Sequence, residues 1–360
     1  MIKDLSISLS KVCDINQSEL YSVGETGHFI ISNPDTRYLL CNAQLMGYYI
    51  YKSLCILTKD FIEYISNTKQ IGSFNIVNIL RGGLNFPVEE ACYANNIKSY
   101  EISFISSERV FTDRKVSKIE SYYRKISVIP DAAIIIGDIV ATGDTLKNVV
   151  NLIVKTYAQH NKKAERLIVL TIGTDIALKT VHLIEKEIKS RWPSFKGITL
   201  FYIEGIFSAY EDTGILKINL PFVDFRPCGL LSIPYREALI SCPHAVFEKC
   251  VIYDGGARRF EPDIHIDEHL CYWEQLMLLG ESIDAQTLFC EKMGYKSFPA
   301  FQEWKLLNHY EKMENKQVKE CYENESRYYQ SLNKFSLVEY ANRHYKELSK
   351  EYKSIKVMNS

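Results

Sequence analysis

The sequence predicts an α/β fold, in which a parallel five-stranded sheet flanked by helices is followed by a mainly helical C-terminal part. Between residues 70 and 205, short apolar runs alternate with stretches of helical periodicity. Within this region one apolar run passes through a turn of small residues into a helix. The last 120 residues show helical periodicity with many tyrosines. Right-handed crossovers are expected to join successive parallel strands.

The composition is that of an ordinary globular protein. The 360 residues are 46% hydrophobic and 24% charged, with a net charge of −1. This balance does not indicate nucleic acid as a partner. The ten cysteines form no Cys-x-x-Cys pair, which fits reduced thiols. No signal pattern or membrane span is recognisable, so we expect a cytoplasmic protein.

Five apolar runs are expected to form the parallel strands. They are Asn75–Leu80, Lys98–Ile105, the run that begins at Ala132, Arg166–Ile172 and Ile198–Ile203. A further short strand is expected at Phe29–Ser32. Apolar spacing predicts a long helix from Arg37 to Ile65, broken near Thr58–Asp60.

The stretch Ala132–Leu146, AAIIIGDIVATGDTL, has the pattern of a phosphate-binding turn. An apolar strand ends near Asp138, the turn Ala141–Thr145 follows, and an amphipathic helix begins at once. Backbone N–H groups at such a turn and helix N-terminus attract anions. Asp138 stands just before the turn, within reach of a hydroxylated or metal-bound part of the same ligand.

A second glycine-containing turn follows the strand Asn75–Leu80. Here Arg81, Gly82 and Gly83 would place a guanidinium and backbone donors at the carboxyl end of a strand, where α/β sheets bind ligands. Alone this pattern is weak, since two glycines also make an ordinary turn.

The two stretches, in this order and about 55 residues apart, resemble the motifs of the type I phosphoribosyltransferases. ILRGGL is most similar to the loop of the uracil type. The resemblance implies the type I phosphoribosyltransferase fold and a site for phosphoribosyl pyrophosphate (PRPP), Mg²⁺ and a small acceptor. It assigns the 5′-phosphate to Ala141, Thr142, Gly143, Asp144 and Thr145, the pyrophosphate to Arg81, Gly82 and Gly83, and catalysis to Asp138 and Arg81. Asp138 would contact the ribose hydroxyls and Mg²⁺, directly or through water.

Three positions bear on the subclass. The family motif has an acid where this chain has Gly137, which weakens the expected ribose contact. Ala141 replaces the acidic base of the hypoxanthine-guanine type and argues against that subclass. Asp144 adds a negative charge beside the phosphate, unless its carboxylate faces outward and caps the helix.

The polar segment 106–130 corresponds to the loop or hairpin that closes over the site in this family. Its candidates for pyrophosphate contact are Arg114, Lys115, Tyr122 and Arg124. For any one of them, a solvated surface charge is an equally good interpretation.

We expect residues 1–240 to form the phosphoribosyltransferase domain with its hood, and 241–360 a helical domain of unknown role. Its helices are expected at Glu268–Leu279, Ala285–Met293, Phe301–Tyr329 and Leu337–Tyr352. This part is a candidate for binding a protein partner, and a homodimer is a further expectation from the family.

Two other patterns in the C-terminal part have both a structural and a binding interpretation. His265 and His269 lie four residues apart on one helical face, which suits a metal, but a polar helix start is the better interpretation. Tyr253–Arg259 combines a glycine turn with two arginines, and a plain connecting turn is favoured over an anion site.

Three functions are compatible with these features. The favoured one is a Mg²⁺-dependent phosphoribosyltransferase acting on a nucleobase or related acceptor. The others are a PRPP- or nucleotide-binding regulator without turnover, and an effector of a bacterial defence or toxin system that acts with a partner.

Overall fold

The computed structural model describes residues 7–69, 71–80, 87–106, 108–112, 115–209 and 225–359. The strands are β1 Leu9–Ile15, β2 Ser18–Val23, β3 Phe29–Ser32, β4 Phe74–Leu80, β5 Tyr100–Ser106, β6 Glu108–Thr112, β7 Lys115–Glu120, β8 Arg124–Lys125, β9 Ala133–Val140, β10 Arg166–Thr174, β11 Ile198–Ala209 and β12 Phe225–Leu231. All but β6 and β7 belong to one sheet.

The sheet is mixed, so the expectation of a purely parallel five-stranded sheet is wrong. The five expected strands, β4, β5, β9, β10 and β11, do pair in parallel, and β3 adds a sixth parallel strand beside β11. Antiparallel strands extend this core, since β2 and β1 follow β3, β8 pairs with β5, and β12 pairs with β11. The additional strands come from segments outside the expected alternation of strands and helices.

The order of the parallel strands, β11-β10-β9-β4-β5, reverses direction between β4 and β9. The chain builds β4 and β5 outward on one side of this point and β9, β10 and β11 outward on the other. In doubly wound sheets, ligands bind at the carboxyl ends of the two strands that flank such a switch point. Here those strands are β4, which precedes Arg81 in the chain, and β9, which precedes the turn Ala141–Thr145.

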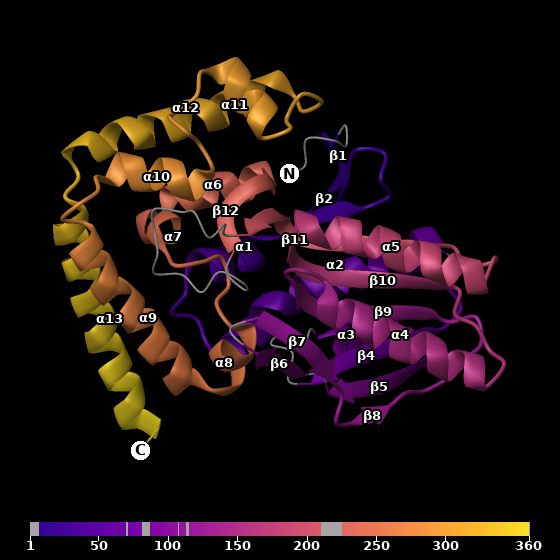
Figure 1. The fold of residues 1–360 in the computed structure, drawn as a ribbon. Helices are drawn as coiled ribbons and strands as arrows, with labels where there is room; N and C mark the ends of the chain where they lie inside the picture. Colours follow the sequence, from indigo (N-terminus) through magenta and orange to yellow (C-terminus); the bar gives the residue numbers. More distant parts are fainter. Residues whose placement is uncertain are drawn as a thin grey trace.

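The helices are α1 Pro34–Cys41, α2 Tyr48–Lys69, α3 Val88–Ala94, α4 Asp144–Gln159, α5 Asp175–Arg191, α6 Ile233–Ser241, α7 Pro243–Phe247, α8 Gly255–Phe260, α9 Pro262–Leu279, α10 Ala285–Met293, α11 Phe301–Leu307, α12 Asn315–Ser331 and α13 Leu337–Asn359. Helices α4 and α5 cover one face of the sheet, and α2 and α3 lie on the other (Figure 1). Helices α9 to α13 lie beside the sheet, at the left and top of the view.

Two expected helices are each divided in the structure. The helix expected from Arg37 to Ile65 is broken at residues 42–47 instead of near Thr58, because Gly47 has a φ of 61° there. The helix expected at Phe301–Tyr329 is α11 and α12, joined by a turn at His309 with a φ of 58°. A single residue with left-handed backbone angles can end a helix without changing the spacing of the apolar residues, so the sequence pattern does not show the break.

Helix α6 begins at residues that favour a helix N-terminus. The Ser232 hydroxyl accepts a hydrogen bond from the backbone N–H of Tyr235, and Pro234 occupies the first turn, where it needs no N–H partner. None of the helices within the described ranges has the length and hydropathy needed to cross a bilayer.

Several contacts cross residue 240. The Arg258 side chain donates to the backbone carbonyls of Leu39, Asn42 and Leu45, and Leu9 N–H at the start of β1 donates to the His309 carbonyl at 3.0 Å. The division into domains 1–240 and 241–360 stays a prediction.

Candidate functional site

The turn after β9 has the geometry that the motif predicts. The strand ends at Val140 and α4 begins at Asp144, with Gly143 as its N-cap residue in the left-handed region at φ 84°. A Cβ atom at Gly143 would lie 2.7 Å from Cγ2 of Thr180 on α5. Both the φ angle and the lack of space therefore require glycine at this position.

Two threonine hydroxyls orient the peptides of the turn. Thr174 Oγ1 donates to the carbonyl of Ala141 at 2.5 Å, and Thr180 Oγ1 donates to the carbonyl of Thr142 at 2.8 Å. In a trans peptide the N–H points opposite to the C=O. The N–H groups of Thr142 and Gly143 consequently point away from these threonines, as anion donors must. Sequence reasoning missed both threonines, because neither belongs to a recognisable motif.

Asp138 lies near the carboxyl end of β9 and is 6% exposed. In the sheet it is paired with Thr171 of β10, and on its other side β9 pairs with β4, which ends at Leu80. The structure thus brings Asp138 and the turn 141–145 to one edge of the sheet, next to the end of β4. Arg81, Gly82 and Gly83 lie outside the described residues.

Asp144 does not cap α4 with its side chain. Its carboxylate instead accepts a hydrogen bond from the Thr142 hydroxyl at 2.6 Å, on the exposed side of the turn. A carboxylate in the first turn interacts favourably with the helix dipole. It also engages the hydroxyl that was expected to bind phosphate, so an incoming phosphate must compete with it.

The segment 106–130 contains the hairpin β6–β7 and the short edge strand β8. Ser121, directly after the hairpin, accepts a hydrogen bond from the side-chain amide of Asn148 on α4 at 3.1 Å. Tyr122 is 66% exposed, and Arg124 is exposed and paired with Ile105 of β5. Arg114 and the side chain of Lys115 lie outside the described part of the chain. The contact of these four residues with pyrophosphate stays a prediction.

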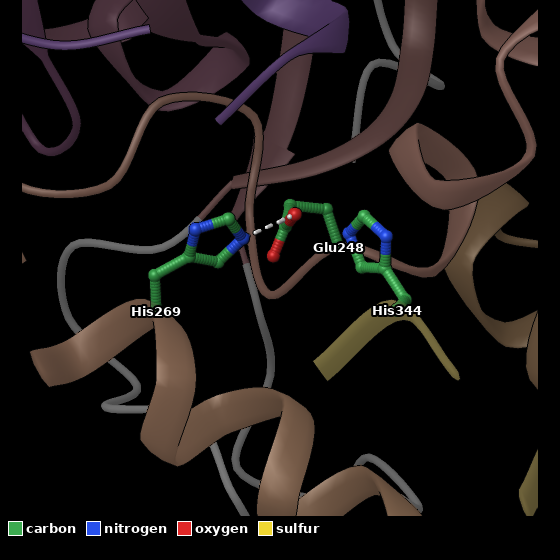
Figure 2. Close-up of side chains that lie close together, drawn as sticks. All are labelled: Glu248, His269 and His344. Atoms are coloured by element: carbon green, nitrogen blue, oxygen red, sulfur yellow. Dashed lines mark hydrogen bonds and ion pairs between the residues drawn. The ribbon is translucent and has the colours of Figure 1, made fainter. Parts of the chain in front are cut away.

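A second polar cluster lies among the C-terminal helices. Glu248, His269 and His344 are buried or nearly so, and their ligand atoms lie within 4.8 Å of one another (Figure 2). Of the two histidines singled out in the sequence, His269 belongs to this cluster. His265 does not, because its Nε2 lies 2.7 Å from the carbonyl of Ala43.

The charges in this cluster are strongly perturbed. Burial alone would raise the pKa of Glu248, but the charge of the His269 ring and hydrogen bonds from His269 and Tyr253 lower it further than burial raises it. Burial lowers the pKa of His344 to about 4. The His344 ring is therefore neutral at pH 7, with one nitrogen lone pair free of a proton.

The plain connecting turn expected at Tyr253–Arg259 is instead the start of helix α8, whose first residues are the two glycines and whose N-cap is Asp254. Arg258 is fully buried and its guanidinium binds carbonyls at and after the end of α1. Cationic groups are favourable at helix C-termini. Arg259 lies over the ring of Tyr51 at 5.1 Å from the centroid.

Gly143→Ala is expected to lower the free energy of unfolding by about 1–3 kcal/mol, since it combines a strained φ with the Thr180 contact. Urea unfolding measures the loss. Gly27→Ala is the matched control, because Gly27 has a φ of 72° with nothing within 4 Å of an added Cβ. Equal losses at both positions would show that the close approach of Thr180 has no energetic effect.

Comparison with known proteins adds little to this geometry. No family model matches the chain, and no curated protein matches it. Among solved structures, the AQ2163 protein from Aquifex aeolicus has a TM-score of 0.36 at 17% identity, over 50% of this chain and 89% of its own. A hypoxanthine phosphoribosyltransferase from Staphylococcus aureus has a TM-score of 0.27 at 16% identity, over 49% and 87%. A purine phosphoribosyltransferase from Pyrococcus horikoshii has 0.27 at 15% identity, over 43% and 83%. These scores are too low to establish a common fold or function, so function is inferred here from the geometry of this chain.

Proposed function

We propose that this chain is a phosphoribosyltransferase that binds PRPP and transfers its phosphoribosyl group to a nucleobase or related small acceptor. One observation carries the proposal. The turn Ala141–Thr145 and the end of β4 flank the switch point of the sheet, at the carboxyl ends of adjacent parallel strands. A ligand with phosphate groups at both ends of a ribose would place one of them at this turn and the other at the end of β4, one strand spacing away.

The 5′-phosphate is assigned to the turn between β9 and α4. The N–H groups of Thr142 and Gly143 point away from Thr174 and Thr180, and the N-terminus of α4 adds its partial positive charge. The pyrophosphate is assigned to Arg81, Gly82 and Gly83, which follow β4 in the chain. Guanidinium and backbone donors together suit a doubly charged leaving group.

Mg²⁺ is the cofactor in this proposal, and Asp138 is its protein ligand, directly or through water. A single buried carboxylate at the strand end fits this ion, because Mg²⁺ often binds through one or two carboxylates and substrate phosphates. When bound, Mg²⁺ would neutralise charge on the pyrophosphate. Asp138 would also hold the ribose hydroxyls, a task that Gly137 cannot share.

In the reaction, a nitrogen of the acceptor forms a bond to C1 of the ribose while the C1–O bond to pyrophosphate breaks. The acceptor loses a proton, and the electron pair of the broken bond leaves with pyrophosphate. The protein contributes position and charge stabilisation more than covalent chemistry. The acceptor subclass, including the resemblance to the uracil type, is part of the proposal.

Titration calorimetry with PRPP and Mg²⁺ tests binding, and pyrophosphate release across a panel of bases tests turnover. Thr142→Ala is expected to weaken PRPP binding about tenfold, the usual effect of losing a hydrogen bond to a charged group. Asp138→Asn is expected to weaken the Mg²⁺-dependent part of binding and to lower the transfer rate.

Asp144→Asn is expected to act in the opposite direction. Removing a negative charge beside the phosphate should tighten PRPP binding about fivefold, because two unit charges about 4 Å apart in water repel by about 1 kcal/mol. The amide oxygen still accepts the Thr142 hydrogen bond, so the turn keeps its local contact. Tighter binding with Asp144→Asn and weaker binding with Thr142→Ala would together locate the phosphate at this turn.

Absence of PRPP binding would rule out this function. Binding without turnover on any base would favour a nucleotide-binding regulator, and a protein that co-purifies and is lost on removal of the C-terminal helices would favour an effector with a partner. Light scattering tests the proposed homodimer.

A further inference from the structure

We propose that Glu248, His269 and His344 form a binding site for a transition-metal dication of the Zn²⁺ type, which joins α9 and α13 to the segment after α7. The three residues come from separate elements. Glu248 follows α7, His269 lies in the middle of α9, and His344 lies on α13, which packs along α9. In Figure 2 the Glu248 side chain lies between the rings of His269 and His344, with its carboxylate hydrogen-bonded to His269.

The donor set matches such an ion. Two imidazole nitrogens and one carboxylate are a known three-residue set for Zn²⁺, with a fourth position filled by water. Ligands about 2.1 Å from a metal lie about 3.0–3.4 Å from each other. Nε2 of His269 and Oε2 of Glu248 are already 2.9 Å apart, and all three ligand atoms lie within 4.8 Å of one another. To bind one ion, the His344 nitrogen must move about an ångström closer to the other two ligand atoms, because those two are already at the required separation.

His344 supplies the second observation that points to a ligand. Its side chain is 11% exposed, and its Nε2 is buried with no hydrogen-bond partner in the described part of the chain. Its other ring nitrogen lies 3.9 Å from Glu347, beyond hydrogen-bond distance. An unpartnered buried imidazole nitrogen is costly, and a metal bond would satisfy it.

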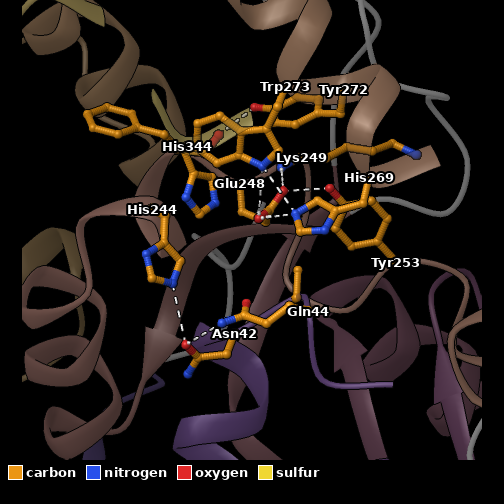
Figure 3. Close-up of polar contacts among 12 residues, drawn as sticks. Asn42, Gln44, His244, Glu248, Lys249, Tyr253, His269, Tyr272, Trp273 and His344 are labelled. Carbon is orange, nitrogen blue, oxygen red and sulfur yellow. Dashed lines mark hydrogen bonds and ion pairs between the residues drawn. The ribbon is translucent and has the colours of Figure 1, made fainter. Parts of the chain in front are cut away.

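Partners behind the first two ligands hold them in place, as is usual for metal sites. The Tyr352 hydroxyl lies 2.7 Å from Nδ1 of His269, which leaves Nε2 to face Glu248. The Tyr253 hydroxyl donates to Oε1 of Glu248 at 2.5 Å, and the Trp273 Nε1–H is shared between Oε2 of Glu248 at 3.3 Å and Nε2 of His269 at 3.1 Å. Tyr253 and Trp273 lie beside Glu248 and His269 (Figure 3).

The competing arrangement is a proton shared between His269 and Glu248, with no metal. It accounts for the 2.9 Å contact equally well. The ring of His344 then packs against His244, Trp273 and Tyr340, but its Nε2 has no hydrogen-bond partner in the described part of the chain. The two arrangements differ in one measurable respect, since only the metal site needs His344.

The test uses the full chain without an affinity tag, treated with EDTA and then freed of chelator. Zn²⁺ is titrated by calorimetry and Co²⁺ by visible absorption. We expect one equivalent of either ion to bind, with Co²⁺ d–d bands that Zn²⁺ displaces, and a higher melting temperature with Zn²⁺. His344→Ala should bind Zn²⁺ at least a hundredfold more weakly.

Two further variants refine the test. Tyr352→Phe, which keeps all three ligands, should bind about 10–100-fold more weakly. The control is His182→Ala on α5, an exposed histidine far from the cluster in sequence, which should bind Zn²⁺ like the wild type.

Binding that is absent, or equally strong in His344→Ala and wild type, would overturn the proposal. If His344→Ala does not fold, Co²⁺ titration of the wild type decides. Bands that saturate at one equivalent support the site, and their absence overturns it. PRPP binding with Mg²⁺ is measured separately, so either proposal can fail without the other.

Discussion

Arg236→Met is expected to lower the free energy of unfolding by about 3–5 kcal/mol, the usual effect of leaving one member of a buried ion pair without its partner. Arg236 on α6 and Glu325 on α12 are both fully buried, 2.8 Å apart. Arg236 also donates to Tyr295, Tyr310 and Asn308. Without the guanidinium, the Glu325 carboxylate stays buried with only neutral donors. Guanidinium chloride unfolding of the full chain measures the loss.

The double variant Arg236→Met/Glu325→Met separates two costs: that of a buried charge without its partner, and that of lost side-chain packing. It should be less destabilised than the sum of the two single variants, because no uncompensated charge remains buried. Lys189→Met is the control, since the side chains of Lys189 and its partner Glu185 are both partly exposed, 48% and 25%, and pairs in contact with solvent contribute about 1 kcal/mol or less. Additive losses in the double variant would show that the two charges do not interact.

Acidification from pH 6.5 to about 4 is expected to destabilise the fold by about 2–3 kcal/mol through His28 alone. Burial lowers the pKa of His28 to about 4, an effect that the charge of Glu185 only partly offsets. The unfolded chain binds this proton near pH 6.5 and the folded chain only near pH 4. Stability contributed by the neutral ring is therefore present above pH 6.5 and is lost as the pH falls toward 4.

His28→Asn isolates this effect. The His28 Nδ1 accepts the backbone N–H of Leu200 at 3.1 Å, and the side-chain oxygen of asparagine occupies a similar position without titrating. Unfolding by urea at pH 7, 5.5 and 4.5 should show a shallower loss of stability in His28→Asn than in the wild type. An exposed-site variant, His182→Gln, should follow the wild type. Parallel curves for His28→Asn and wild type would contradict the expected pKa.

The parts of the fold predicted correctly were those encoded by local pattern. Each of the five apolar runs forms a parallel strand, because buried strands need continuous apolar residues wherever they lie in the sheet. The Ala141–Thr145 turn was likewise predictable, because its backbone needs a positive φ at residue 143 and the sequence has glycine there. The observed φ of Gly143 is 84°. Strands β1 and β2 were missed, because polar and charged residues are mixed with apolar ones in both, and neither shows a clear alternation, although only β1 is an exposed edge strand.

The parts that could not be predicted depend on contacts between distant residues. No spacing in the sequence places Thr180 against the carbonyl of Thr142, or His344 beside His269, 75 residues earlier. The paired histidines His265 and His269 suggested a site on one helical face, but burial turned His265 toward the carbonyl of Ala43. Which side chains share a site is decided by helix packing, which a single sequence encodes only indirectly.

The hydrogen bond from the backbone N–H of Leu9 to the carbonyl of His309 has a consequence for the synthesis of the chain. Strand β1 lies at the edge of the sheet, and its first N–H is covered only by a turn roughly 300 residues later. At about 5–20 residues per second, that turn is translated some 15–60 s after β1. During this interval the edge is open to pairing with other chains. Slow or interrupted translation after residue 240 is therefore expected to favour aggregation of the nascent chain, even though the complete parallel core has already been made.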